Sequence, residues 1–477
     1  MDPLDIVSKA IVGITKSYGK KVGKKTERPD IPEAKPVSFG GDAYKLGFSK
    51  AEIMPDLTKG KTYYIAGHGS GHVMEGVLSP VYVHAVYISC GGEEGIIWLS
   101  ADIVGLTNTE LQIIRDRIYA SGKMKGIKAV TLSCTHSHSG IDTIGYWGKP
   151  FLSIPADGKD PEYMNMLFDK AVQVAEEAYA NAKSGKLYCG KVRIPDGLYT
   201  GRLFADKHEI LTRVRFAPAD GSRETWIMNF GGHPNSLGGS NRLLSGEYPY
   251  FMREHIAEEK GADVFYCIGA VGGMDCAEYE TEVPLERVKY QARLIADYSY
   301  KIEDETELEP EVKVLRQEFY MPVDNNVLLL LAMKGTMSFK AYPDKISSLG
   351  VAMKTEMTYF SLGSQKFLTL PGENFINTVY GGYMDAEHST TGKGPEINPK
   401  PLCEIANDEG MVAIGVTNDM TGYVVPPNDF ILNKTQPYLN GTKDRFGKNH
   451  YHETNSMGPN SQKTIADTFA TVVKNFG

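Results

Sequence analysis

The chain lacks the features that mark several large classes of protein. Among its 477 residues no stretch approaches the roughly 18 apolar residues of a membrane span, because the densest run, 327–333, ends at Lys334. Its six cysteines are scattered without a CxxC pair, which argues against a disulfide-stapled scaffold and favours reduced thiols. Basic residues are not in excess, since 51 Lys and Arg stand against 59 Asp and Glu. The net charge of −8 argues against nucleic acid as a partner.

The N-terminal segment lacks the continuous apolar core of a secretory signal, so we expect a cytoplasmic protein. Its apolar residues fall on one helical stripe instead, with lysines pointing away: Leu4, Val7, Ile11, Ile14 and Tyr18. Two readings of residues 4–25 stay open. The helix packs on its own domain, or it makes peripheral contact with an anionic membrane.

The rest of the chain predicts one large catalytic domain. Residues 29–36 hold three prolines among charges, which favours an extended linker, so we divide the chain into an N-terminal helix and linker, 1–42, and a domain, 43–477. Short apolar runs alternate with amphipathic helical stretches, which predicts an α/β fold of mixed β-sheet layers flanked by helices, with a mixed or mostly parallel sheet. The predicted strands are 95–100, 129–133, 226–230, 264–268, 367–370 and 412–416, and the clearest helices are 109–119, 161–182 and 286–302.

Polar or glycine-rich sequence follows each predicted strand. Asp102 follows the first, and the others lead into CTHSHSG (134–140), GGHPNS (231–236), GAVGGMD (269–275), PGENF (371–375) and TNDMTGYV (417–424). In α/β proteins the loops beyond the carboxyl ends of strands bind ligands, so these loops are expected to converge on one site. A further glycine-rich stretch, 67–72, lacks the lysine of a phosphate-binding loop and is interpreted as a turn lining the cleft.

Several of these loops carry residues that can ligate a metal. The chain has only 11 histidines, and His136 and His138 form an HxH pair at a strand end, where both rings would project to the same side. His233 and Glu373 follow two other strands, and imidazole and carboxylate are usual zinc donors. For each residue a structural role stays open as the alternative: a hydrogen-bonded histidine, or an acid exposed on a turn.

Taken together, the motifs resemble those of the neutral and alkaline, non-lysosomal ceramidase family. THSHSG at 135–140 is similar to the family's THTHSGP motif, a histidine and an SGE segment follow at 233 and 245–247, and PGE stands at 371–373. A segment of the ND-x-x-GY type ends at Tyr423. The order and spacing agree from about residue 47 to 459, which is nearly the whole domain. The resemblance implies a zinc ion held by His136, His233, Glu373 and Tyr423, with His138 beside the metal as a proton carrier or oxyanion stabiliser.

The departures from the family lie in segments that would face the substrate. Asp275 stands where the family has a serine that approaches the substrate, and Pro80 and His84 stand where the family carries arginines. Arg202 is a loose match to another family arginine. The family's longer members end in a β-sandwich domain, so the resemblance covers the catalytic domain only.

The sequence thus predicts a zinc-dependent hydrolase that cleaves the amide bond of an N-acyl substrate, ceramide or a related amide, by metal-activated water. His138 assists proton transfer, and Asp102 and Asp275 are candidates to orient a ligand histidine or to accept a proton. Two alternatives stay open: a zinc amidase or esterase acting on a non-lipid substrate, and a binding protein that keeps the fold without turnover.

Overall fold

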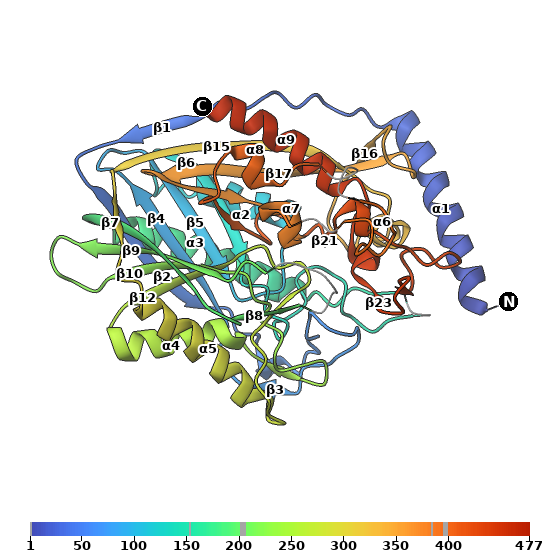
Figure 1. Cartoon of the computed structure of the whole chain (residues 1–477), viewed down its shortest axis with the longest axis horizontal. Coiled ribbons are helices and arrows are strands. Elements are labelled where there is room, and N and C mark those ends of the chain that lie inside the picture. Colours follow the sequence, from blue (N-terminus) through green and yellow to red (C-terminus); the bar gives the residue numbers. More distant parts are fainter. Residues whose placement is uncertain (1, 152–153, 201–206, 383–384, 395–398) are drawn as a thin grey trace.

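The computed structural model describes residues 2–151, 154–200, 207–382, 385–394 and 399–477. Within them, two β-sheets pack face to face and helices cover both outer faces, an α/β architecture with mixed sheets (Figure 1). The larger sheet runs in the order β12 (Asp263–Ile268), β10 (Thr225–Phe230), β9 (Ile210–Pro218), β7 (Lys183–Arg193), β2 (Tyr44–Glu52), β4 (Tyr82–Ser89), β5 (Gly95–Ala101) and β6 (Ile127–Cys134), with β14 (Thr306–Leu308) beside β7.

The smaller sheet runs in the order β1 (Val37–Gly40), β15 (Glu311–Pro322), β17 (Val351–Leu362), β18 (Gln365–Thr369) and β20 (Val412–Ile414), with β16 (Ala341–Pro343) beside β17. The core between the sheets is apolar on both inner faces. Trp98 on β5 meets Phe360 and Phe367 of the smaller sheet, with ring centroids 5.4 and 6.1 Å apart. Such aromatic contacts add to the free energy gained by burying the rings.

The six predicted strands are all present, and of the two expected kinds of sheet the mixed one is found, with most neighbouring strands antiparallel. Within the described strands of the two large sheets, parallel pairing is confined to β5 with β6, β10 with β12, and β18 with β20. Only five residues, 90–94, join β4 to β5, and a connection that short can join only antiparallel neighbours. Short apolar runs predict a strand without fixing the direction in which it pairs.

The outer helices fix these layers. Helix α3 (Pro161–Ala180) lies over β2 and β4, and it begins where the Asp160 side chain accepts the N–H of Tyr163 at 2.9 Å. Helices α4 (Glu247–Lys260) and α5 (Pro284–Tyr300) pack together beside β12 and β9, whereas α9 (Ser461–Phe476) lies on β15 (Figure 1). The remaining helices of at least five residues are α1 (Pro3–Lys25), α2 (Asn108–Ala120), α6 (Asn326–Met333), α7 (Ile376–Tyr380) and α8 (Leu402–Ala406).

The N-terminal helix α1 packs against α6 and β16, largely through the predicted stripe. Of the predicted residues, Ile11 is buried and Ile14 is 50% exposed, while the other three are half-buried: Leu4, Val7 and Tyr18. Gly19 adds a close contact beside this stripe, because a Cβ there would lie 1.8 Å from the Leu349 carbonyl oxygen. The buried residues are Ser8, Ile11, Thr15, Gly19 and Val22.

The segment after α1 runs without helix or strand over residues 26–36, as its prolines predict, and then forms β1. Strand β1 pairs with β15, a contact that the sequence did not reveal, so residues of the predicted linker contribute to the smaller sheet. The division of the chain at residue 43 stays a prediction. Among the described helices, none combines the length and apolar character needed to cross a bilayer.

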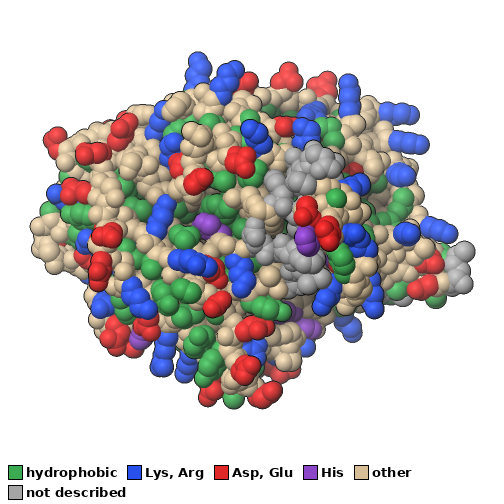
Figure 2. Space-filling view, viewed as in Figure 1, with side chains coloured by type: hydrophobic (Ala, Val, Ile, Leu, Met, Phe, Trp, Pro, Cys, Tyr) green, Lys and Arg blue, Asp and Glu red, His purple; other side chains and the backbone are tan. Residues whose placement is uncertain are grey.

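The surface carries charges of both signs. On the face that Figure 2 shows, Lys and Arg side chains are interspersed with Asp and Glu. All six cysteines are buried and unpaired, and burial raises the pKa of Cys134 and Cys276, the two nearest the candidate site, above that of a free thiol. Those two thiols are therefore packing groups, not nucleophiles.

Candidate metal centre

Four loops that follow strands bring their polar side chains to one place. His136 and His138 come after β6, His233 after β10, Glu373 after β18, and Tyr423 after β20. Glu373 and Tyr423 are register partners in a short parallel pair, β19 (Glu373–Asn374) with β21 (Tyr423–Val424), which sets the two side chains next to each other. All five residues are buried. The predicted convergence of these loops therefore occurs.

The donor atoms lie at separations that suit one small cation. The Nε2 atoms of His136 and His138 are 3.2 Å apart, and Oε2 of Glu373 lies 3.3 Å from Nε2 of His136 and 3.1 Å from Nε2 of His233. Ligands 2.0–2.1 Å from a tetrahedral zinc ion would be separated by about 3.3 Å. The three imidazoles also form the one group of at least three His, Cys, Asp or Glu side chains, among the described residues, with ligand atoms within 4.8 Å of one another.

The opposite ring nitrogens of two histidines are held by backbone carbonyl groups. Nδ1 of His136 lies 2.5 Å from the Val104 carbonyl oxygen, and Nδ1 of His233 lies 2.7 Å from that of Met274. A carbonyl oxygen can only accept, so Nδ1 of each ring carries the hydrogen and Nε2 of the neutral ring presents a lone pair. This is the usual environment of a metal-ligating histidine.

The electrostatics of the centre follow from burial and from the approach of Glu373. Burial would raise the pKa of the Glu373 carboxyl group, but the charges and hydrogen bonds of His136 and His233 lower it overall. Burial would lower the pKa of His233, yet Glu373 raises it overall. The pKa of Tyr423 is raised by burial and by the neighbouring Glu373 carboxylate, which also accepts the phenol's hydrogen bond. Without a metal ion, the site must keep an extra proton to offset the carboxylate.

His138 differs from the other two histidines. Its Nδ1 is buried and has no hydrogen-bond partner among the described residues. Burial and the neighbouring imidazoles hold its pKa well below the ordinary value, so the ring is neutral. It therefore lacks the carbonyl partner that fixes His136 and His233, which favours a proton-carrying role over ligation. Its Nε2 is nevertheless close enough to the other donors to be a ligand.

The local backbone explains how these rings meet. The sequence predicted an extended strand end with both HxH rings on one side, but His136 adopts a left-handed conformation with φ of 63°. Such a conformation is unfavourable for a residue with a side chain and is often found at functional sites. Gly67, with φ of 104°, lies against His138, where a Cβ would come within 2.6 Å of the histidine Cα. The glycine-rich loop at 67–72 does line the centre, as predicted.

An apolar cavity of about 60 Å³ opens beside the donors. It has room for about two water-sized groups. Its floor is formed by the candidate ligands, and its walls are mostly apolar: Val104, Ile144, Tyr146, Trp147, Leu328, Met337 and Met420. Such walls suit an apolar group of a ligand.

Two other predicted site residues, Asp102 and Asp275, do not join the donor cluster. Asp102 is fully buried, and its carboxylate is taken up by Arg253 at 2.5 Å, by the Tyr82 N–H at 3.0 Å and by the Thr135 hydroxyl at 3.2 Å. The histidines are oriented by backbone carbonyls, so the geometry does not support Asp102 as their orienting group. It ties the end of β6 to α4 instead. Arg202 lies outside the described residues.

Asp275 lies next to the centre without joining the donor set. It forms a parallel β-bridge with His233, and its Oδ1 accepts a hydrogen bond from the Asn235 side chain at 2.6 Å. Its carboxylate does not hold the His233 ring, because the Met274 carbonyl does. The charge of Asp275 contributes to the raised pKa of His233. Asp275 also lines a second, larger cavity next to this bridge.

Some contributing residues were not predicted from the sequence. The carbonyl groups of Val104 and Met274 carry no side-chain signal, so no motif could reveal them. His68 was recognised only as part of a glycine-rich turn, but its ring packs edge-on against His138 with centroids 5.0 Å apart. Buried Glu247 accepts the Ser139 hydroxyl at 2.8 Å, and burial raises its pKa to about 7. Glu247 thereby anchors the HxH loop.

Comparisons with known proteins support the architecture. No family model and no curated protein sequence matches the chain. Among solved structures, the chain is similar to a neutral ceramidase from Pseudomonas aeruginosa, with a TM-score of 0.63 and 14% sequence identity over 91% of this chain and 75% of that one. A ceramidase complexed with C2 matches with the same values. The chain therefore has a neutral ceramidase-like fold.

Proposed function

We propose that this protein is a zinc-dependent hydrolase that cleaves the amide bond of an N-acyl substrate. His136, His233 and Glu373 would hold the metal ion, with Tyr423 as the fourth protein ligand. The proposal is supported by the donor geometry and by the likeness of the fold to the neutral ceramidases. The substrate class, ceramide or a related N-acyl amide, comes from that likeness and from the apolar walls of the small cavity.

One observation carries the metal assignment. The carbonyl partners leave two Nε2 lone pairs pointing toward the same carboxylate oxygen of Glu373, at 3.1 and 3.3 Å. Lone pairs facing a carboxylate repel one another unless a cation lies among them. Extra protons on the imidazoles could supply this positive charge. However, two imidazoles, a carboxylate and a neighbouring phenol are a donor set suited to zinc. The residues present therefore fit the ion.

When bound, zinc would polarise the scissile carbonyl group and lower the pKa of a water molecule toward neutrality. The chain's own residues would do the rest. The apolar walls receive the acyl group and keep bulk water out. His138, neutral and held beside His136, is placed to take a proton at Nε2 from the attacking water and to return it to the departing nitrogen. In the net reaction a C–O bond forms, the C–N bond breaks, and the amine leaves with a proton.

A zinc amidase or esterase acting on a non-lipid substrate is the second candidate, and the size of the cavity favours it. A space of about 60 Å³ suits a short acyl group better than a long one. The same donor set would serve either substrate, so the two candidates share one mechanism and differ in what the cavity and its surroundings accept.

The test is a panel of fluorogenic acyl amides and matched esters, from acetyl to palmitoyl, assayed with the full chain after its zinc content has been measured. Hydrolysis of amides by zinc-loaded protein is the expected result. Preference for long acyl chains would favour a ceramidase, whereas preference for short ones would favour the non-lipid candidate. Zinc-loaded protein that hydrolyses neither amides nor esters would contradict the proposal and leave a binding protein.

A further inference from the structure

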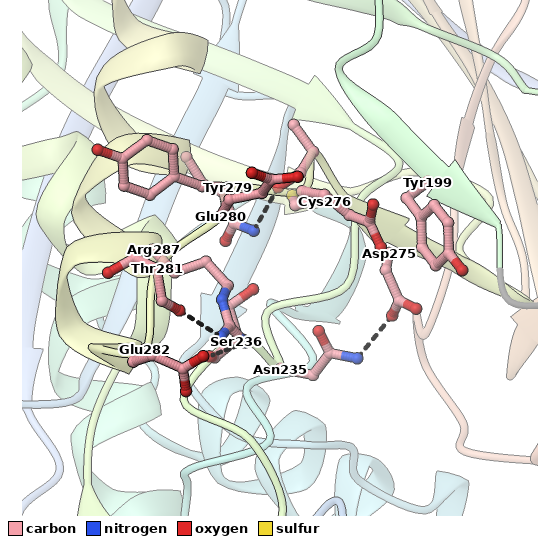
Figure 3. A pocket seen from close by; sticks show the side chains of 13 residues that line it. Tyr199, Asn235, Ser236, Asp275, Cys276, Tyr279, Glu280, Thr281, Glu282 and Arg287 are labelled. Atoms are coloured by element: carbon pink, nitrogen blue, oxygen red, sulfur yellow. Dashed lines mark hydrogen bonds between the residues drawn. The ribbon is translucent and has the colours of Figure 1, made fainter.

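A second cavity, of about 820 Å³, lies beside the candidate metal centre. The two are linked by the backbone: Asp275 forms a β-bridge with His233, and Asn235, two residues after His233, donates to the Asp275 carboxylate (Figure 3). Both Asn235 and Asp275 line the second cavity. A group bound there would contact the strand end that carries a candidate ligand.

The lining of this cavity is acidic. Four carboxylates contribute, against one cationic side chain, Arg287, and the acids are Asp275, Glu278, Glu280 and Glu282. The guanidinium group of Arg287 is taken up by backbone carbonyl oxygens, of Ser236 at 3.3 Å and Thr281 at 3.2 Å (Figure 3). Among the described residues, none of the ion pairs involves one of the four acids. The cavity therefore presents a negative potential to solvent.

A buried side chain on the wall adds an independent indication of a ligand. Gln291 is 1% exposed, and its Nε2 donates to the Ala277 carbonyl oxygen at 2.9 Å. Its Oε1, at the cavity wall, has no hydrogen-bond partner within the described part of the chain. Because a buried acceptor without a donor is destabilising, a ligand that brings an N–H group fits this position.

Aromatic faces complete the lining. Tyr279 stacks on Tyr290 with centroids 4.5 Å apart, and both rings stay partly exposed, by 42% and 37%. Tyr199, on the opposite side in Figure 3, lies next to Asp275. Tyrosine faces attract cations. Together with carboxylates and an unpaired carbonyl oxygen, they form a surface of acceptors that suits an ammonium group, which has donors only.

The lining of this cavity suits an organic cation better than a metal ion. Within the described residues, the carboxylates of this cavity do not converge as the histidines of the metal centre do. A volume of about 820 Å³ is also far larger than a single ion requires. Spread charges in a roomy cavity suit an extended molecule whose positive charge lies several bonds from its other polar groups.

We propose that this acidic cavity binds the amine side of the substrate and that this side carries a second, positively charged amino group, as in an N-acylated diamine or polyamine. The inference rests on the proposed function, because the acyl end must reach the metal centre while the cation lies against Glu280 and Glu282. Hydrolysis then releases a diamine whose two ammonium groups are both attracted to this acidic lining.

The first test uses binding alone. We would titrate 1,4-diaminobutane, and 1,4-butanediol as its neutral counterpart, into the full chain by calorimetry. The expected result is that the diamine binds and the diol does not, and that the double variant E280Q/E282Q lowers diamine affinity at least about fivefold. Because both glutamates are exposed, the variant should fold, and its melting temperature would confirm that. The control E258Q/E259Q removes the same charge from exposed residues of α4.

Equal binding of the diol and the diamine, or equal loss in the two double variants, would overturn the cation site. The second test compares kcat/KM for N-acetyl-1,4-diaminobutane and N-acetylbutylamine. Preference for the diamine that E280Q/E282Q abolishes is expected. Hydrolysis of both at equal rates contradicts the subsite but keeps the hydrolase. Diamine binding without hydrolysis keeps the cavity as a cation site and contradicts the proposed function.

Discussion

The metal centre and the acidic cavity adjoin each other but are built in opposite ways. In the centre every candidate ligand is buried, and the histidine rings of His136 and His233 are fixed by carbonyl groups at 2.5 and 2.7 Å. In the cavity, Glu278, Glu280 and Glu282 are exposed on one loop and make no ion pairs among the described residues. The first arrangement is preorganised for chemistry, whereas the second supplies charge without fixed geometry. Under the two proposals, reaction type and substrate choice are carried by separate parts of the fold.

The largest expected effect comes from a change in the buried candidate metal centre. His233→Ala removes one donor and leaves Glu373 without its partner at 3.1 Å, so the chain should lose most of its zinc and at least about 10³-fold in turnover. Metal content and hydrolysis rate would be measured on the same sample. His255→Ala on α4, a histidine outside the centre, is the matched control and should change neither. Full zinc occupancy and turnover in His233→Ala would show that the ligand assignment is wrong.

The second effect separates ligation from proton transfer within the centre. His138→Ala should keep zinc but lose about 10² to 10⁴ in rate, the range for a positioned acid or base. The reason is that His138 lacks the carbonyl partner of the two ligand histidines. Metal analysis decides the matter, since loss of zinc from this variant would make His138 a ligand.

The third effect follows from the raised pKa of His233 in the metal-free protein. A proton held by that ring competes with zinc, so zinc affinity should fall as the pH drops through that pKa, by up to about tenfold per pH unit for one proton. Above that pKa this competition should disappear. Competition titrations with a zinc-selective chelator between pH 5 and 9 would measure it. An affinity that is flat through acidic pH would place the metal elsewhere.

The smallest effect concerns the boundary between the two regions. Asp275→Ser should shift the kcat/KM ratio toward ceramide and away from a polar N-acyl amide, by about tenfold, because a charge facing the amine side is removed. Asp275→Asn is the control that keeps the shape and an acceptor for Asn235. It should shift the ratio in the same direction if charge is the cause. Ceramide as the preferred substrate of the unmodified chain would contradict this role of Asp275.

The sequence predicted the centre better than the cavity, for physical reasons. His136, His233 and Glu373 each follow an apolar strand, a local signal that is readable from one sequence, whereas Tyr423 was predicted only through the family resemblance. The direction in which β4 and β5 pair, by contrast, depends on the short connection between them and on packing. On α1 the close contact at Gly19 was not predicted, because Gly19 meets Leu349, which is more than 300 residues away in the chain. The sequence made no prediction for the acidic run at 278–282, and only the fold shows that it lines a cavity together with Asn235 and Arg287.

Asp102 shows a second limit of prediction from the sequence, since a residue expected to be catalytic has another role in the fold. A carboxylate directly after a buried strand predicts a catalytic group, and the fold pairs it instead with Arg253 on α4. No local pattern identifies that partner, 151 residues later in the chain. A buried ion pair of this kind stabilises only while both partners remain. The sequence identified the end of β5 as close to the candidate metal centre. It could not show which polar groups there face the small cavity beside the donors.

The most direct measurement of the central claim is zinc content and amide hydrolysis in one preparation of the full chain, followed through removal and return of the metal. The account predicts one zinc ion per chain, loss of hydrolysis when a chelator removes it, and recovery when one equivalent of zinc is restored. Chelated, zinc-free protein that hydrolyses N-acyl amides at the original rate would contradict it.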